Sequence, residues 1–188
     1  MSSYQPNDTT LSTSRKPRMA LMRLLDSLPL AAFLTYLALA RPQRPDAWLL
    51  PYALAAVLAA LALAASQLTR RIHNRIHVGL ACYFISGAAA LLFGWQAINQ
   101  WYGAVEAAAM LSWVAVVGVV TTAVSRYGFI GVDAISRGAA VRASLKLLAV
   151  ALSAAAMSFA FVGDGMLWHA YLPFSALFVV QAALRARL

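Results

Sequence analysis

Long apolar segments alternate with short polar ones along the chain. Six of them run to about twenty mostly apolar residues, the length that an α-helix needs to cross the hydrocarbon core of a bilayer. We predict spans at about 24–40, 48–66, 78–95, 103–124, 145–162 and 167–184. The connections are short, as in antiparallel helix hairpins, and the longest, 125–144, has room for a short interfacial helix. The pattern predicts an all-α, polytopic membrane protein that folds as a six-transmembrane-helix bundle.

The N-terminal segment differs in composition from the rest. Residues 1–20 are rich in Ser, Thr, Asn and Pro, which predicts a polar cytoplasmic tail and leaves 21–188 as one membrane domain. The first span has a basic start and ends in Ala38-Leu39-Ala40, as a signal peptide does before its cleavage site. We expect this segment to be retained as the first transmembrane helix.

Basic residues mark one side of the predicted membrane domain. With the N-terminus inside, thirteen Lys and Arg residues are cytoplasmic, and only Arg41 and Arg44 are outside. This distribution follows the positive-inside rule and predicts that both termini are cytoplasmic. Aromatic residues that prefer the membrane interface mark the outer ends of the spans: Trp48, Tyr52, Trp95, Trp101, Tyr102, Trp168 and Tyr171.

The composition supports a membrane location and limits the kinds of partner that we expect. The chain is 62% hydrophobic and only 11% charged, whereas soluble domains are about 25% charged. The net charge of +9 is explained by cytoplasmic loops, and without a basic, aromatic-interleaved soluble segment we expect no nucleic acid. The expected partners are the lipid bilayer and its anionic headgroups. Cys82 is the single cysteine, which excludes a disulfide within the chain and indicates a small buried filler.

The segment "RRIHNRIHVG", residues 70–79, forms a basic hairpin between the second and third spans. Its polar residues are Arg70, Arg71, His73, Arg75 and His77. Two histidines four positions apart are typical of metal sites, but no third ligand lies nearby in sequence and the guanidinium groups would repel a divalent cation. We therefore expect a topology anchor at anionic headgroups, with no metal and no cofactor. A pH-sensing role is the alternative.

Acidic residues next to apolar spans are the other candidates for function. Asp26 follows Arg23 by three residues, so both can share one helical face. A carboxylate at the membrane centre costs roughly 2.5–3.5 kcal/mol on insertion scales, so such a residue usually pairs or faces a cavity. We expect an interfacial pair of Arg23 and Asp26, and a functional contact of Asp26 within the bundle is the alternative.

Three more polar residues fall at the predicted outer face. Glu106, Asp164 and His169, together with Asp46, are able to form an outward cation or proton site. We expect instead independent interfacial residues, with His169 at the membrane edge.

Two features of the last spans predict how helices pack. Gln181 near the inner end of the sixth span indicates an interhelical hydrogen bond. Small residues at helical spacing in "AVALSAAAMSFA" of the fifth span indicate close packing inside the bundle, with a homodimer face as the alternative.

Enzyme chemistry is not expected from these residues. The aspartate cluster of a CDP-alcohol phosphotransferase is missing around Asp133. Ser112 in "MLSWV" lacks the flanking glycines of an intramembrane serine protease. Haem would need paired histidines inside the membrane. The chain is therefore predicted not to be an enzyme.

The start of the first span, "LLDSLPLAAFLTYLAL", resembles the septation protein A family of small inner-membrane proteins. The matching residues are Leu25, Asp26, Leu28, Pro29, Leu30, Phe33 and Tyr36. The basic hairpin and Trp101 agree with the family in position. The family's Lys-Lys-Pro segment after the fourth span is replaced here by "SRYGFIG", and its Asn in the fifth span is missing.

The resemblance implies a non-enzymatic role in cell-envelope integrity and septation. Such a protein would reside in the bacterial inner membrane and act through helix contacts with the division or cell-wall machinery. The sequence leaves two alternatives open: a small transporter or substrate-binding membrane subunit with an outward-facing polar site, and a membrane immunity or exclusion protein.

Overall fold

The structure is a computed structural model that describes residues 15–40, 45–69, 72–132 and 136–188, with side chains from Leu25 onward except at 38, 45 and 46. Its described residues form helices and connections without any strand. In chain order the elements are α1 (Arg15–Ala40), the 3-10 helix η2 (Pro45–Trp48), α2 (Leu49–Leu68), α3 (Arg75–Leu92), α4 (Gln96–Val105), α5 (Ala107–Val124), α6 (Arg137–Ala160), the π-helix η3 (Leu167–Tyr171) and α7 (Leu172–Arg185).

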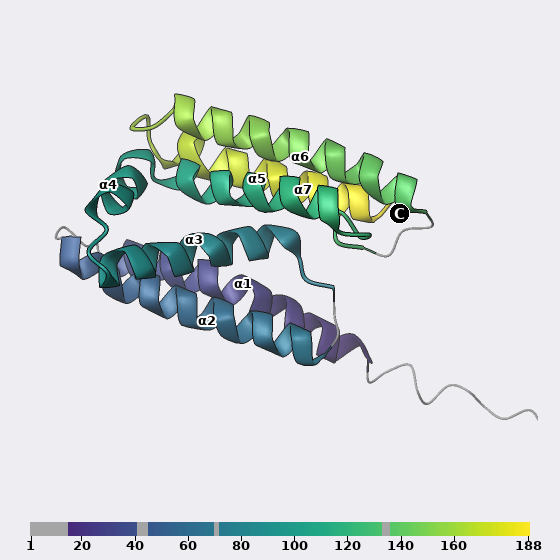
Figure 1. The fold of residues 1–188 in the computed structure, drawn as a ribbon, viewed down its shortest axis with the longest axis horizontal. Helices are drawn as coiled ribbons and strands as arrows, with labels where there is room; N and C mark the ends of the chain where they lie inside the picture. The colour runs from purple at the N-terminus through teal and green to yellow at the C-terminus, as the bar shows by residue number, and fades with distance from the viewer. Residues whose placement is uncertain (1–14, 41–44, 70–71, 133–135) are drawn as a thin grey trace, which may run out of the picture.

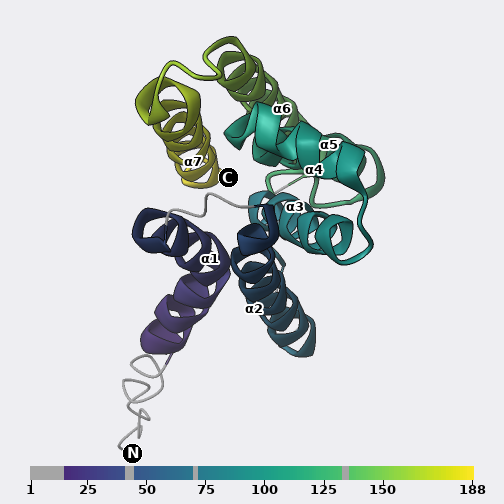
Figure 2. The same ribbon diagram turned by 90° about the vertical axis from the view of Figure 1, so that its left-hand side faces the viewer.

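The helices are arranged in two layers of three. Helices α1, α2 and α3 form one layer, and α5, α6 and α7 form the other (Figure 1). Seen from the end, α3 and α5 meet at the centre of the molecule and α4 lies across that end (Figure 2). Most helices pack on their neighbours in the chain, so the α3–α5 contact is the main connection between the layers.

The described helices confirm an all-helical protein with several candidate membrane spans. Five helical segments are long and apolar enough to cross a bilayer: α2, α3, α5, α6 and the continuous Leu167–Arg185. In α1 the described apolar segment is Leu25–Leu37, which is shorter than a full span. The count of six spans therefore stays a prediction. Residues 1–14 of the expected tail lie outside the described residues, and α1 already begins at Arg15.

Two predicted boundaries are wrong. The expected span 103–124 is divided at Glu106, where a positive φ of 45° ends α4 and α5 begins at the next residue. The expected connection 125–144 is shorter than predicted because α6 begins at Arg137. The hydroxyl of Ser136 accepts a hydrogen bond from the Ala139 amide at 3.2 Å, which caps the first turn of α6.

A glycine on α3 allows the two layers to approach closely. A Cβ atom on Gly79 would lie only 2.6 Å from Cα of Val114 on α5, so a larger residue there would push the helices apart. Small residues have the same use in many membrane helix pairs, where close backbone approach provides van der Waals contact. On α6 the predicted internal packing is confirmed for Ala151, Ala155 and Ser158, which are buried. The other row of small residues in this segment, Ala156 and Ala160, is exposed.

An aromatic cluster fills the centre of the first layer. The ring of Phe33 lies 5.2 Å from that of Tyr52 and 5.0 Å from that of Phe84, measured between centroids. The hydroxyl groups of Tyr52 and Tyr83 are hydrogen-bonded to each other. Tyr102 accepts a hydrogen bond from Trp113 Nε1 at 2.7 Å. The interior is thus apolar in bulk and its hydroxyl groups are paired.

The predicted aromatic belt is wrong for two of its members. Tyr52 and Tyr102 are only 6% and 5% exposed, because their hydroxyl groups find partners inside the bundle. Trp95, Trp101, Trp168 and Tyr171 are exposed near the same end of the molecule, which we call the aromatic end. Cys82, expected to be buried, is partly exposed.

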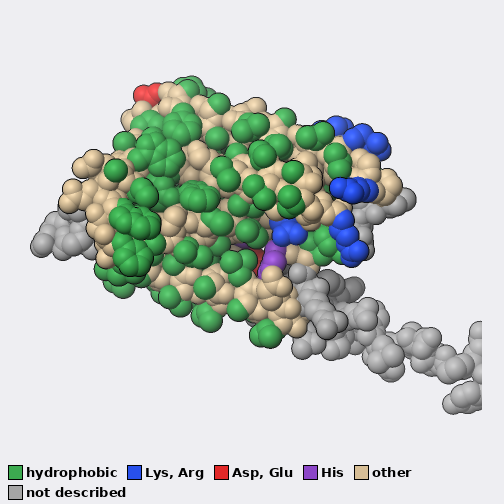
Figure 3. Space-filling model, viewed as in Figure 1, with side chains coloured by type: hydrophobic (Ala, Val, Ile, Leu, Met, Phe, Trp, Pro, Cys, Tyr) green, Lys and Arg blue, Asp and Glu red, His purple; other side chains and the backbone are tan. Residues whose placement is uncertain are grey.

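The opposite end of the bundle carries the described basic side chains. We call it the basic end; Lys and Arg side chains gather there in Figure 3. Its described members are Arg75, Arg126, Arg137, Arg142, Lys146, Arg185 and Arg187. The molecule is therefore polarised along the helix axes, with apolar side chains covering much of the visible surface between the two ends.

Replacing Gly79 with Ala tests the close approach of α3 and α5. The added Cβ meets the Val114 backbone, so we expect a loss of about 1–3 kcal/mol in the free energy of unfolding. Gly103→Ala on α4 is the matched control, because nothing lies within 4 Å of its Cβ position, and it should be neutral or stabilising by up to about 1 kcal/mol. Denaturant unfolding of the purified protein in detergent measures both, and equal losses would contradict the packing argument.

Candidate functional site

The junction of α4 and α5 brings a charged side chain to the aromatic end. Glu106 has φ 45° and ψ −118°, the only positive φ of a non-glycine residue in the described part of the chain. Such a backbone conformation costs about 1–3 kcal/mol and persists only where the surroundings enforce it. The Glu106 side chain is 58% exposed. Strained residues of this kind occur often at functional sites, so the junction is a candidate on backbone geometry alone.

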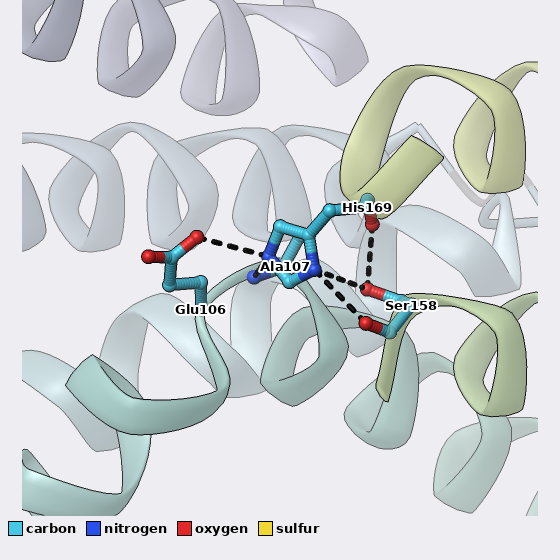
Figure 4. Close-up of polar contacts among 4 residues, drawn as sticks. All are labelled: Glu106, Ala107, Ser158 and His169. Carbon is cyan, nitrogen blue, oxygen red and sulfur yellow. Dashed lines mark hydrogen bonds and ion pairs between the residues drawn. The ribbon is translucent and has the colours of Figure 1, made fainter. Parts of the chain in front are cut away.

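A buried histidine from the segment just before α7 contacts this junction. His169 lies on the π-helix η3 and is only 2% exposed. The ring nitrogen Nδ1 is 2.9 Å from the carbonyl oxygen of Ser158 on α6, and the Ser158 hydroxyl donates to the His169 carbonyl at 2.6 Å. These two contacts tie η3 to α6 and fix the plane of the imidazole (Figure 4). Short π-helical turns are rare and are frequent at functional sites.

The second ring nitrogen of His169 meets two groups at once. The backbone N–H of Ala107, the first residue of α5, lies 3.1 Å from Nε2. The Oε2 atom of Glu106 lies 3.0 Å from the same nitrogen (Figure 4). A carboxylate, an imidazole and the first amide of a helix therefore converge on one point, and their hydrogen bonds depend on which of them carries a proton.

These contacts correct part of the sequence prediction. The expected independence of Glu106 and His169 is wrong, because the two side chains are in contact, and His169 is buried rather than at an open edge. Asp164 lies exposed in the connection before η3, and the structure gives it no contact with this pair. The side chain of Asp46 lies outside the described residues. Whether the pair has a function stays a prediction.

A second polar cluster lies toward the basic end, between α1, α2 and α3. Asp26, His73, Asn74 and His77 line a cavity of about 20 Å³, which is large enough for a water molecule. The Nδ1 atom of His77 is buried and has no hydrogen-bond partner among the described residues. A bound water would satisfy it, so the cavity suits an ordered water and is too small for a solute.

The basic hairpin is built differently from the expected interfacial turn. His73 precedes α3 and hydrogen-bonds to Ser66 of α2, and the ring of His77 lies 5.9 Å from that of Phe178 on α7. Both histidines therefore face the bundle rather than the headgroups alone. Arg70 and Arg71 lie outside the described residues, and Arg75 is half-buried.

Asp26 lines the same cavity as the two histidines, a neighbourhood that sequence spacing alone did not reveal. It comes from another helix, more than forty positions before His73. Among the described residues no group of three His, Cys, Asp or Glu side chains is placed to hold a metal ion. The side chain of Arg23 is not among those described, so its pairing with Asp26 stays a prediction.

One interhelical hydrogen bond predicted from the sequence is confirmed. Gln181 on α7 is 4% exposed and donates from Nε2 to Oδ1 of Asn74 at 2.7 Å. Asn74 donates back to Oε1 of Gln181 at 3.3 Å. The same Asn74 oxygen accepts from the Ile76 amide at 3.2 Å and so caps α3. This reciprocal amide pair joins the two layers near the basic end.

A double-mutant cycle measures the strength of the Asn74–Gln181 pair. Asn74→Ala and Gln181→Ala each destabilise the protein, and Asn74→Ala costs more because it also removes the cap of α3. The interaction energy should be about 1 kcal/mol, as for other hydrogen bonds between membrane helices. Unfolding of the four proteins in detergent gives this value. Strictly additive losses would mean that the two amides do not interact.

Comparison with known proteins does not assign the chain to a family. No protein-family model, no curated protein and no solved structure matches it. The resemblance of the first span to the septation protein A family therefore stays a prediction, and a function must be argued from the residues and their contacts.

Proposed function

We propose that this chain is a multi-pass protein of a bacterial inner membrane that supports cell-envelope integrity through helix contacts, without catalysing a reaction. The observation that carries the proposal is the packing of the interior. Large apolar side chains such as Phe33, Phe84, Leu147 and Leu177 are fully buried. The cavity beside Asp26 admits a water molecule and no larger ligand. A packed bundle of this kind is suited to presenting helix surfaces to other membrane proteins.

The surface between the two ends supports contacts within the membrane. Exposed apolar side chains on α5 include Val116, Val119 and Val120, and those on α6 include Leu145 and Leu152. In a bilayer these faces meet lipid tails or other apolar helices. Membrane proteins of the division or cell-wall machinery, or a second copy of the chain, are the partners that we propose for them.

The polarity of the bundle supports an orientation. We place the basic end and both termini in the cytoplasm, since cytoplasmic segments of membrane proteins collect Lys and Arg. The described basic residues Arg137, Arg142 and Lys146 at the start of α6 and Arg185 and Arg187 at the end of the chain lie at this end. The aromatic end would then face outward, which places Glu106 at the outer surface.

A deletion strain tests the envelope proposal. We expect longer cells and greater sensitivity to osmotic and detergent stress, and rescue by the wild-type gene. Asp26→Asn removes the charge but keeps the shape of a residue that lines the inner cavity, so it should rescue poorly. Asp164→Asn makes the same change at an exposed position and should rescue fully. Normal growth of the deletion strain under every stress would overturn the proposal.

A small transporter with an outward-facing polar site is the second candidate. The contact between Glu106 and His169 favours it, because ionisable pairs inside membrane helices often belong to proton or ion pathways. The rings of Tyr83 and Tyr102 lie side by side with centroids 4.9 Å apart, and Tyr83 interacts electrostatically with Glu106. Such a pathway would carry protons across a closed, packed interior.

Proteoliposomes containing the purified protein test the transporter. A potassium diffusion potential should drive proton uptake, reported by an enclosed pH-sensitive dye, and His169→Gln should abolish it. Asp164→Asn should retain the flux, because its side chain is exposed and away from the pair. Uptake equal to that of protein-free vesicles would exclude this candidate.

A further inference from the structure

The protonation of one nitrogen of His169 follows from its partner. A carbonyl oxygen only accepts hydrogen bonds. Since Nδ1 lies 2.9 Å from the Ser158 carbonyl oxygen, Nδ1 carries a hydrogen. In the neutral ring the other nitrogen, Nε2, then holds a lone pair. The Ala107 N–H at 3.1 Å is a suitable donor to that lone pair.

The contact with Glu106 is not compatible with this neutral form of His169, because the carboxylate and the unprotonated Nε2 are both acceptors. An ionised carboxylate also only accepts, yet Oε2 lies 3.0 Å from Nε2. Their contact requires a proton between the two atoms, carried either by the imidazole or by the carboxyl group. If Nε2 carries it, the nitrogen no longer accepts from the Ala107 N–H. The three groups therefore cannot all be satisfied in one protonation state.

We propose that Nε2 of His169 and the carboxylate of Glu106 form a binding site for a single proton, and that proton uptake releases the first amide of α5. The site is a binding site for a proton from the aqueous phase at the aromatic end, because the Glu106 side chain is 58% exposed while the imidazole is buried. The inference does not depend on either proposed function. It rests on the contacts of His169 alone.

Two groups of opposite polarity lie beside Nε2 of His169. They are the Glu106 carboxyl group, at 3.0 Å, and the N-terminus of α5, which begins at Ala107 and carries partial positive charge. From α6 the ring faces the uncharged Ser158. From α3 the Tyr83 hydroxyl, which is hydrogen-bonded to that of Tyr52, interacts electrostatically with Glu106.

Proton uptake changes the junction between α4 and α5. In the imidazolium form Nε2–H donates to Glu106, and the Ala107 N–H loses its acceptor. Glu106 is also the strained residue at which the two helices meet. Release of Ala107 therefore removes one of the contacts that hold this backbone in place, and α4 becomes freer to move relative to α5 on acidification.

Histidine NMR on the full chain in lipid bilayers tests the site. The three histidines carry 13C and 15N labels, and His169→Gln assigns the signal. At neutral pH we expect the tautomer with hydrogen on Nδ1, and at acid pH a doubly protonated ring. Glu106→Gln should reduce the ratio of protonated to neutral His169 at a given acid pH, because it removes the carboxylate that accepts from Nε2–H. Asp164→Asn, the matched control at the same end, should leave it unchanged.

A second variant and a second measurement distinguish a specific effect of Glu106→Gln from misfolding of that variant. Glu106→Asp keeps the charge but shortens the side chain by one methylene group, which moves the carboxylate away from His169. Its effect on the protonation of His169 should therefore be smaller than that of Glu106→Gln. Hydrogen exchange, corrected for the intrinsic effect of pH, should show lower protection of the Ala107 amide in acid. A neutral ring with hydrogen on Nε2, or equal shifts for Glu106→Gln and Asp164→Asn, would overturn the proposal.

Discussion

The close approach of α3 to α5 at Gly79 and Val114 is the constraint on which the rest of the molecule depends. Each three-helix layer is built from neighbours in the chain, and this contact is the main connection between the layers. Helices in a bilayer gain little from apolar burial, because lipid tails are equally apolar. The association of the layers must therefore come from close packing, for which a residue without a side chain is required at Gly79.

The polar contacts are placed on either side of this seam. At one end His169 connects η3 to α6 and to the start of α5, and at the other Gln181 connects α7 to Asn74. Polar groups inside a membrane must find partners within the protein. The bonds of His169 lie within the second layer and fix η3 against α5 and α6. The Asn74–Gln181 pair crosses the seam, and because an apolar contact surface alone permits sliding, this directional pair fixes the register of the second layer against the first.

The sequence predicted the helices better than their junctions. The apolar lengths placed α2 and α3 within a few residues, because span length is set by the bilayer. The break at Glu106 was not predictable, since apolar residues continue on both sides and Glu favours helices. The burial of His169 was missed because its partners come from other helices. For Gln181 a lone amide in an apolar span indicated a bond, but nothing identified Asn74 as the partner.

The pair of Asn74 and Gln181 also has a consequence for synthesis of the protein. The two residues are 107 positions apart, so Asn74 is made long before its partner. Until Gln181 is in place, the Asn74 amide has to be satisfied by water or by other groups. The polar connection between the layers is thus completed only when α7 packs against the start of α3. A chain that lacks α7 would leave the Asn74 amide at the basic end without its reciprocal partner.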